Sequence, residues 1–175
     1  TGAKQVFRAA EPFEPFWFED PVKMNNLDAV AELAQYTRIP ITASETLATR
    51  YAFRELMAKK AAGIVMLDLA WCGGISEAKK IATMAEAHHL PVAPHDCTGP
   101  ITLISSIHLS LNCPNALIQE TVRAYYTGWY KDLVTDLPRI EKGEVYPMTK
   151  PGLGTKLLPD IARRKDAIVR RTTEA

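Results

Sequence analysis

The 175-residue sequence lacks a large net charge, a long hydrophobic run and an even set of cysteines. Lys and Arg number 21 against 20 Asp and Glu, so the net charge of +1 gives no electrostatic footprint for nucleic acid or for an anionic membrane. No stretch approaches the roughly 20 apolar residues that span a bilayer, and the N-terminal residues contain no apolar core of a cleavable leader. We therefore expect a soluble protein that binds neither nucleic acid nor membrane.

The three cysteines exclude two further classes. Cys72, Cys97 and Cys113 are odd in number and widely spaced, which fits neither a disulfide framework nor a C-x-x-C zinc site. We therefore expect reduced thiols and a cytoplasmic location. What the chain does have is 47% hydrophobic residues, enough for one globular domain with a substantial core. With macromolecular partners disfavoured, we expect the partner to be a small molecule.

Five short apolar runs each end on an ionisable residue, and their ends are evenly spaced. The runs are FWFE, IPITASE, GIVMLD, LPVAPH and ALIQE, and they end 26, 23, 27 and 25 residues apart, on Glu19, Glu45, Asp68, His95 and Glu120. This spacing is typical of one strand-plus-helix unit of a (β/α)8 barrel. The sequence therefore predicts parallel strands that all end at one mouth.

The segments between these runs have helical spacing. Apolar residues recur on one face after Asn26 and again after Ser76, the two residues that we expect to cap these helices. After Glu120, GWYKDLVTDLP predicts a last amphipathic helix, and the Gly- and Pro-rich residues that follow predict an extended segment. We predict a partial barrel over residues 1–140 and an extended closing segment and tail over residues 141–175.

Strand ends in a barrel of parallel strands surround the mouth where active sites lie. Four of the five strand-end residues are carboxylates, which repel one another unless a cation lies between them. Oxygen ligands of this kind suit a divalent cation such as Mg²⁺. The pattern therefore predicts a metal-dependent active site in which one carboxylate pairs with the histidine.

The same motifs resemble the enolase superfamily. FWFEDP, Ser44-Glu45, Leu67-Asp68 followed by GGISEAKKIA, VAPHDCTGP, LIQE and the later PGLG are similar to its mandelate racemase-like branch, which contains acid-sugar dehydratases of the galactonate dehydratase type. The resemblance covers nearly the whole chain. It keeps the order and the spacing of the five strand-end residues.

The resemblance implies a role for each of these residues. Glu19 and Glu45 would be two ligands of an essential Mg²⁺, and Ser44 stands where the family usually has Gly. Asp68 would orient His95, which exchanges the α-proton of the substrate. Glu120 would hydrogen-bond the substrate carboxylate.

The resemblance also implies that the chain is a C-terminal portion of the barrel. The five runs would be strands 4–8, and the N-terminal capping domain, the first strands, one metal ligand and a second acid/base group would precede Thr1. We therefore expect that this chain alone is inactive, and that the complete enzyme is a homo-oligomer.

The implied activity is that of a carbon–oxygen lyase. It would remove the α-proton of a sugar acid, form an enediolate and expel water to give a 2-keto-3-deoxy acid. Two alternatives stay open: a racemase, epimerase or cycloisomerase of a related carboxylate, and an inactive barrel fragment that needs the rest of the enzyme. Arg50 and Trp71 follow strand ends and are further candidates for substrate contact, whereas His88, His89 and His108 have simpler structural explanations.

Overall fold

A computed structural model of the chain describes residues 2–170 and shows an arc of five parallel segments. Strands β1 (Phe18–Glu19), β2 (Ile41–Ala43) and β3 (Ile64–Val65) pair in parallel in that order. The arc continues through single parallel bridges from Val65 to Val92 and from Val92 to Ala116. The predicted succession of parallel strands is confirmed.

Backbone hydrogen bonds between neighbouring segments continue toward the strand ends. The amide of Met66 donates to the carbonyl of Ala43 at 2.7 Å, and the amide of His95 donates to that of Leu67 at 2.9 Å. The amide of Glu120 completes the series by donating to the carbonyl of Pro94 at 3.3 Å. Parallel pairing therefore carries the side chains that follow each strand to one end of the arc.

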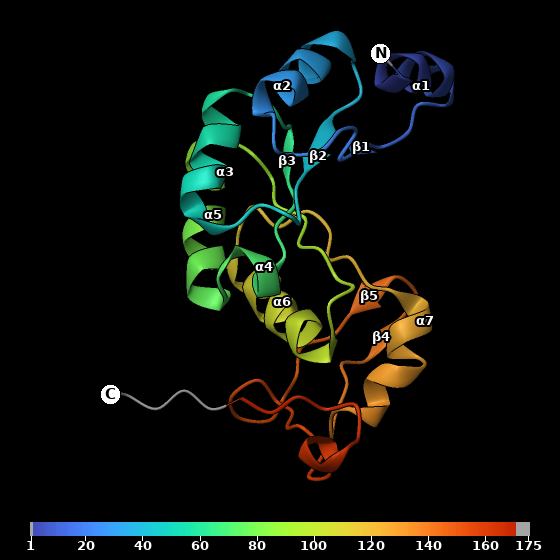
Figure 1. Cartoon of the computed structure of the whole chain (residues 1–175), viewed down its shortest axis with the longest axis vertical. Coiled ribbons are helices and arrows are strands. Elements are labelled where there is room, and N and C mark those ends of the chain that lie inside the picture. The colour runs from blue at the N-terminus through green and yellow to red at the C-terminus, as the bar shows by residue number, and fades with distance from the viewer. Residues whose placement is uncertain (1, 171–175) are drawn as a thin grey trace.

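Helices α2, α3 and α5 stand around the outside of these strands (Figure 1). The α-helices are α1 (Gly2–Ala10), α2 (Leu27–Tyr36), α3 (Thr49–Ala58), α4 (Leu69–Cys72), α5 (Ile75–Ala87), α6 (Pro100–Asn112) and α7 (Arg123–Tyr126). Short 3-10 turns are η1 (Glu11–Phe13), η2 (Trp129–Asp132) and η3 (Ile161–Arg163). The main core lies between helices and strands, where Val30, Leu56, Ile81, Val65 and Val92 are buried.

One of the two predicted helix caps is confirmed and the other is wrong. The side chain of Asn26 accepts the amide of Ala29 at 3.1 Å, as expected of a cap. Helix α5 instead begins at Ile75 after Gly74, so Ser76 lies inside its first turn. Gly73 and Gly74 both have positive φ, which lets the chain turn directly from α4 into α5 without a side-chain cap.

The predicted helix over GWYKDLVTDLP is also wrong. Helix α7 ends before this stretch, at Tyr126, and only the short 3-10 turn η2 forms within it. Tyr130 of η2 is buried in a second small core with Leu103 and Ile107 of α6. The chain then forms an antiparallel hairpin of β4 (Ile140–Glu141) and β5 (Glu144–Val145). The division at residue 140 stays a prediction, and residues 171–175 of the predicted tail lie outside the described part.

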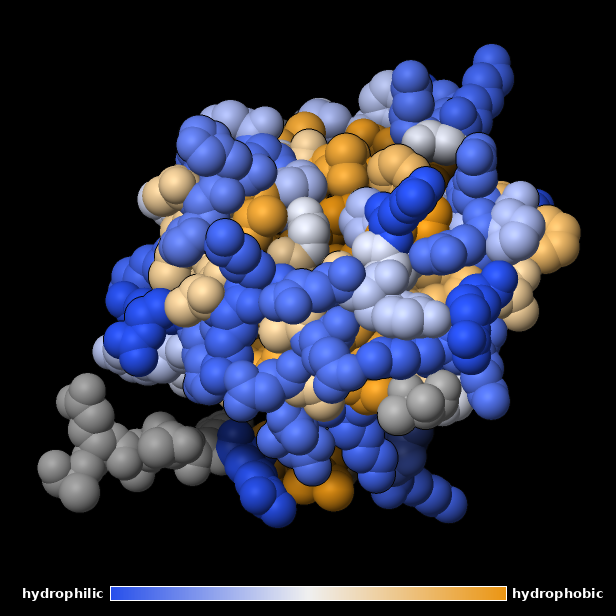
Figure 2. Space-filling model, turned by 90° about the horizontal axis from the view of Figure 1, so that it is seen from above, coloured by the Kyte–Doolittle hydropathy of each residue, from blue (hydrophilic) through white to orange (hydrophobic). Residues whose placement is uncertain are grey.

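Apolar surface remains exposed on the molecule. Figure 2 shows hydrophobic side chains between hydrophilic ones on the face seen from above. Within residues 2–170, no strand pairs with the outer side of β1 or with the far side of Ala116, so both edges of the arc are open. No helix in this range is long and apolar enough to cross a membrane.

Candidate active site

A buried histidine and a buried aspartate form the centre of the site. The Nδ1 atom of His95 lies 2.8 Å from Oδ2 of Asp68, and the Asp68 side chain is fully buried. Because an ionised carboxylate can only accept hydrogen bonds, Nδ1 carries the proton and donates it to Asp68. The other ring nitrogen, Nε2, is then the atom that can take up a proton.

Asp68 is held in place by further donors. Its Oδ1 accepts the amides of Ala70 at 2.6 Å and of Trp71 at 3.3 Å, so it also caps α4. Its Oδ2 accepts the hydroxyl of Thr98 at 3.0 Å as well as His95. Four donors therefore fix the orientation of this carboxylate and, through it, of the imidazole.

The environment of His95 favours its protonated form. The hydrogen bond to Asp68 raises its pKa above the usual value, burial opposes this rise, and the charge of Glu120 adds to it. Around Nε2 lie the thiol of Cys97 at 3.3 Å and Oε2 of Glu120 at 3.9 Å. The group is thus a proton carrier with a raised basicity that faces the mouth of the arc.

Glu120 is positioned by the residue that follows the histidine. The amide of Asp96 donates to Oε2 of Glu120 at 2.8 Å. Asp96 itself is fully buried, and its side chain accepts the hydroxyl of Tyr130 at 3.0 Å. Burial raises the pKa of Asp96 to about 6, although the bond from Tyr130 opposes the rise.

The carboxylates that follow β1 and β2, on the other side of the mouth, lack a full set of hydrogen-bond donors. Burial, Glu120 and Glu45 raise the pKa of Glu19, in that order. Burial raises the pKa of Asp20 to about 7, the bond from Ser44 opposes this, and Glu45 raises it further. Among the described residues, Oε2 of Glu45 and Oδ1 of Asp20 are buried oxygens without a hydrogen-bond partner.

These unpartnered oxygens fit a cation. Buried anionic oxygens that repel one another are stabilised when a divalent cation lies between them, and Glu19 and Glu45 supply the hard ligands that Mg²⁺ prefers. Within residues 2–170, however, no three His, Cys, Asp or Glu side chains are arranged to hold a metal ion. Glu19 and Glu45 stay predicted metal ligands.

The five residues predicted from strand ends do come together. His95 contacts Asp68 and lies near Glu120, and the charges of Glu120, Glu45 and His95 all act on Glu19. The predicted roles of these residues stay predictions.

Of the two further candidates for substrate contact, Arg50 is paired with an acidic side chain and Trp71 is exposed. Arg50 is engaged with Glu77, since Nε donates to Oε1 at 2.8 Å and a second nitrogen donates to Oε2 at 2.5 Å. Trp71 is exposed after the cap of α4.

Sequence reasoning did not assign the contacts of several residues that shape the site. Ser44 donates to Oδ2 of Asp20 at 2.6 Å and so joins the ends of β1 and β2. Asp96, Tyr130 and Cys97 surround the dyad and Glu120. The one available signal was the position of Asp20 and Asp96 directly after two of the predicted site residues.

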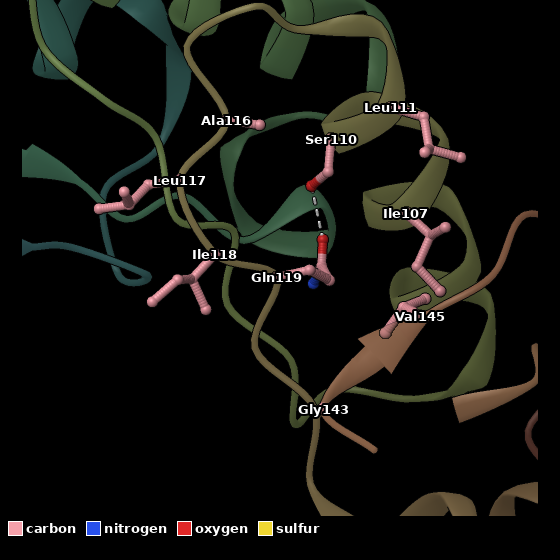
Figure 3. Close-up of a pocket in the computed structure, with 9 residues that line it drawn as sticks. All are labelled: Ile107, Ser110, Leu111, Ala116, Leu117, Ile118, Gln119, Gly143 and Val145. Carbon is pink, nitrogen blue, oxygen red and sulfur yellow. Dashed lines mark hydrogen bonds between the residues drawn. The ribbon is translucent and has the colours of Figure 1, made fainter. Parts of the chain in front are cut away.

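A pocket lies on the open edge of the arc and does not include any of the five site residues. Figure 3 shows it between α6, residues 116–119 and β5, with Ser110 donating to Oε1 of Gln119 at 2.8 Å. Leu111, Leu117 and Ile118 line it and are exposed. This pocket is therefore separate from the chemistry at the mouth.

Comparison with known proteins decides the family. A family model described as "Enolase C-terminal domain-like" matches residues 1–161. This chain belongs to the enolase superfamily. The resemblance to the mandelate racemase-like branch is also confirmed by relatives and solved structures.

Two curated relatives of this enolase-superfamily chain are dehydratases by name. The D-galactonate dehydratase of Pectobacterium atrosepticum is 35% identical over 172 residues, which cover 94% of this chain and 45% of that protein. The D-xylonate dehydratase of Haloferax volcanii is 34% identical over 155 residues, which cover 89% and 37%. The chain thus spans less than half the length of either relative.

Solved structures agree with the family and with the α/β architecture. An enolase of the mandelate racemase subgroup from Agrobacterium tumefaciens is 55% identical with a TM-score of 0.87, covering 93% of this chain and 44% of that one. An enolase from the environmental genome sequencing of the Sargasso Sea is 45% identical with a TM-score of 0.90, covering 99% and 46%. The backbone described above therefore matches part of the fold of this superfamily's C-terminal domain.

Proposed function

We propose that this chain supplies the proton-transfer dyad and part of the metal site of a hydro-lyase that dehydrates a sugar acid, of the aldonate or aldarate type, to a 2-keto-3-deoxy acid. The observation that carries the proposal is the buried pair of Asp68 and His95, joined at 2.8 Å and facing carboxylates with unpartnered oxygens. The names of the two dehydratase relatives support the reaction type. We also propose that the five parallel segments correspond to barrel strands 4–8.

In this proposal His95 begins the reaction. Its Nε2 atom takes the proton from the carbon next to the substrate carboxylate, while Asp68 stabilises the imidazolium that results. Glu120 in its protonated form donates a hydrogen bond to the substrate carboxylate, on which negative charge develops. The enediolate then expels the hydroxyl group of the β-carbon, which takes up the proton that His95 accepted and leaves as water, and the enol that remains becomes the keto acid.

Removing a proton next to a carboxylate places a second negative charge on the same group. Glu19 and Glu45 would hold Mg²⁺, which supplies positive charge for this dianion when bound. This positive charge lowers the barrier only if it stabilises the dianion more than it stabilises the substrate. The poorly satisfied oxygens of Glu45 and Asp20 are the structural support for this assignment.

The test uses the complete enzyme, by which we mean a chain of the relatives' length that contains these 175 residues. It is incubated with aldonates and aldarates in deuterium oxide with millimolar Mg²⁺, and the products are analysed by mass spectrometry. A product lighter by one water supports dehydration. Deuterium at the α-carbon without loss of water identifies a racemase or epimerase instead, and neither change with any carboxylate contradicts the proposal.

A further inference from the structure

A second buried carboxylate lies beside the dyad, and the proposed mechanism does not use it. Asp96 is fully buried although it is an ionisable residue. Residues of this type are rarely buried without a specific partner. Its contacts show what it is bound to.

Asp96 is hydrogen-bonded at two points to the segment that carries Glu120. Its own amide donates to Oε2 of Glu120 at 2.8 Å, and its Oδ2 accepts the amide of Val122 at 3.4 Å. Glu120 is the residue expected to hold the substrate carboxylate, and Val122 lies two residues further along the chain. Asp96 therefore restrains the side chain of Glu120 directly and the backbone that follows Glu120 through Val122.

Tyr130 fixes Asp96 from the opposite side. Its hydroxyl donates to Oδ1 of Asp96 at 3.0 Å, and its ring is fully buried against Leu103 and Ile107 of α6. A bond to a charged acceptor is stronger than one between neutral groups, and the buried ring cannot leave without opening the small core. The hydroxyl group of Tyr130 thus connects the turn η2 to Asp96, next to the mouth.

We propose that Asp96 and Tyr130 form a positioning pair that sets the separation between His95 and Glu120. This inference rests on the proposed function, because it assigns the pair to the same reaction. Asp96 directly follows His95 and binds Glu120, so the 3.9 Å between Nε2 and Oε2 depends on where Asp96 lies. One substrate must reach His95 with its α-proton and Glu120 with its carboxylate at the same time, and this separation decides whether it can.

The charges around the pair are consistent with this arrangement. The titratable groups that face Asp96 are Glu120, His95, Cys97 and Tyr130. Burial and the nearby charge of Asp96 raise the pKa of Tyr130, so the phenol stays protonated and keeps its hydrogen to donate. The bond from Tyr130 to Asp96 therefore persists over the pH range in which His95 titrates.

The experiment removes a single hydroxyl group. Tyr130→Phe in the complete enzyme keeps the ring in the small core and deletes the bond to Asp96. Tyr125→Phe is the matched control, since Tyr125 packs against Tyr130 and its hydroxyl has no hydrogen-bond partner among residues 2–170. Misplacing a catalytic group by about 1 Å can lower the rate roughly 10²-fold, so Tyr130→Phe should lower kcat about 10- to 100-fold with little change in KM. Tyr125→Phe should keep the wild-type kcat.

A double-mutant cycle separates positioning from a general structural defect. If the pair acts through Glu120, Tyr130→Phe should lower kcat in the wild type but have almost no effect when Glu120→Gln is already present. An equal loss in both backgrounds would mean that Tyr130 acts by another route, and an unchanged kcat in the wild type would overturn the inference outright.

A measurement without turnover keeps this test independent of the proposed function. The side-chain carboxyl of Glu120, labelled with carbon-13, should change its chemical shift on Tyr130→Phe and not on Tyr125→Phe. If the wild-type complete enzyme dehydrates nothing but this shift changes, the proposed function fails and the positioning pair stands. If the shift is unchanged, the positioning pair is wrong whatever the activity.

Discussion

The two sides of the mouth satisfy their carboxylates in opposite ways. On the proton-transfer side, Asp68 is fully buried yet accepts four hydrogen bonds. On the metal side, Glu45 and Asp20 each keep a buried oxygen without a partner among the described residues, and burial together with neighbouring acids raises the pKa of Glu19. One side is satisfied by hydrogen bonds within the protein, and the other is the side that we propose binds Mg²⁺.

The largest expected effect is on the proton-transfer side. His95→Asn in the complete enzyme keeps polarity and approximate size but cannot carry a proton. General acid–base groups are typically worth about 10² to 10⁴ in rate, so α-proton exchange with deuterium oxide should fall by at least that range. His89→Asn is the control, because His89 has positive φ at a helix end and asparagine tolerates this conformation. Exchange at close to the wild-type rate in His95→Asn would remove the dyad assignment.

A third kind of carboxylate sharpens the comparison. Asp96 is fully buried, and its pKa is raised from 3.8 to about 6, mainly by burial. A raised pKa means that the folded state favours the protonated acid. The protonated acid therefore stabilises the folded state fully below pH 4, and this stabilisation is lost as the pH rises through 6. The shift in pKa corresponds to roughly 3 kcal/mol of unfolding free energy.

Asp96→Asn should therefore stabilise the complete enzyme at pH 8 relative to the wild type. The gain in unfolding free energy should be smaller than the roughly 3 kcal/mol that corresponds to the pKa shift. The reason is that the amide of Val122 loses its acceptor. Urea unfolding at pH 4, 6 and 8 measures the difference between the two proteins. If the difference in unfolding free energy between wild type and variant is the same at pH 4 and at pH 8, Asp96 does not titrate as described.

The metal side should respond to a cation without any substrate. A ligand that binds only the folded state adds about 2.7 kcal/mol of stability at a concentration 100 times its Kd. Millimolar Mg²⁺ should raise the Tm of the complete enzyme, and Glu45→Gln should remove most of this rise. Glu86→Gln, a change at an exposed acid of α5, should leave it intact. An undiminished Mg²⁺ response in Glu45→Gln would place the cation elsewhere.

The smallest expected effect is a change in pH dependence. Asp68→Asn keeps the shape of the side chain but removes the charge next to His95. The bond to Asp68 is the main cause of the raised histidine pKa, so this pKa should fall and the pH–rate profile should move toward lower pH. Titration of the imidazole by NMR in both proteins measures the fall directly. A histidine that titrates at the same pH in the variant would show that Asp68 does not set its basicity.

The strand ends could be predicted from sequence because they follow the repeat of the fold. Strand-plus-helix units of similar length bring Glu19, Glu45, Asp68, His95 and Glu120 to one edge, and this requires only local periodicity. The caps show the limit of such local rules. Asn26 caps α2 as predicted, but two glycines before α5 made a cap at Ser76 unnecessary.

The contacts of the turn η2 could not be predicted in this way. Tyr130 and Asp96 are 34 residues apart, and the turn η2 that delivers the tyrosine has no repeating pattern. The amphipathic spacing around Tyr130 predicted a helix, whereas burial of its ring against α6 decided the structure. Tertiary packing overrides local propensity where elements are short.

The exposed thiol at the mouth offers a way to observe the site directly. Cys72 and Cys113 are buried, and burial raises the pKa of Cys72 to about 11, so neither is accessible to a reagent in the folded protein. Cys97 is exposed, with its sulfur 3.3 Å from Nε2 of His95. Burial also raises the pKa of the Cys97 thiol, so labelling requires alkaline pH. A maleimide fluorophore would then attach at Cys97 rather than at the other two cysteines of this chain, and its emission would report occupancy of the mouth in real time without altering the sequence.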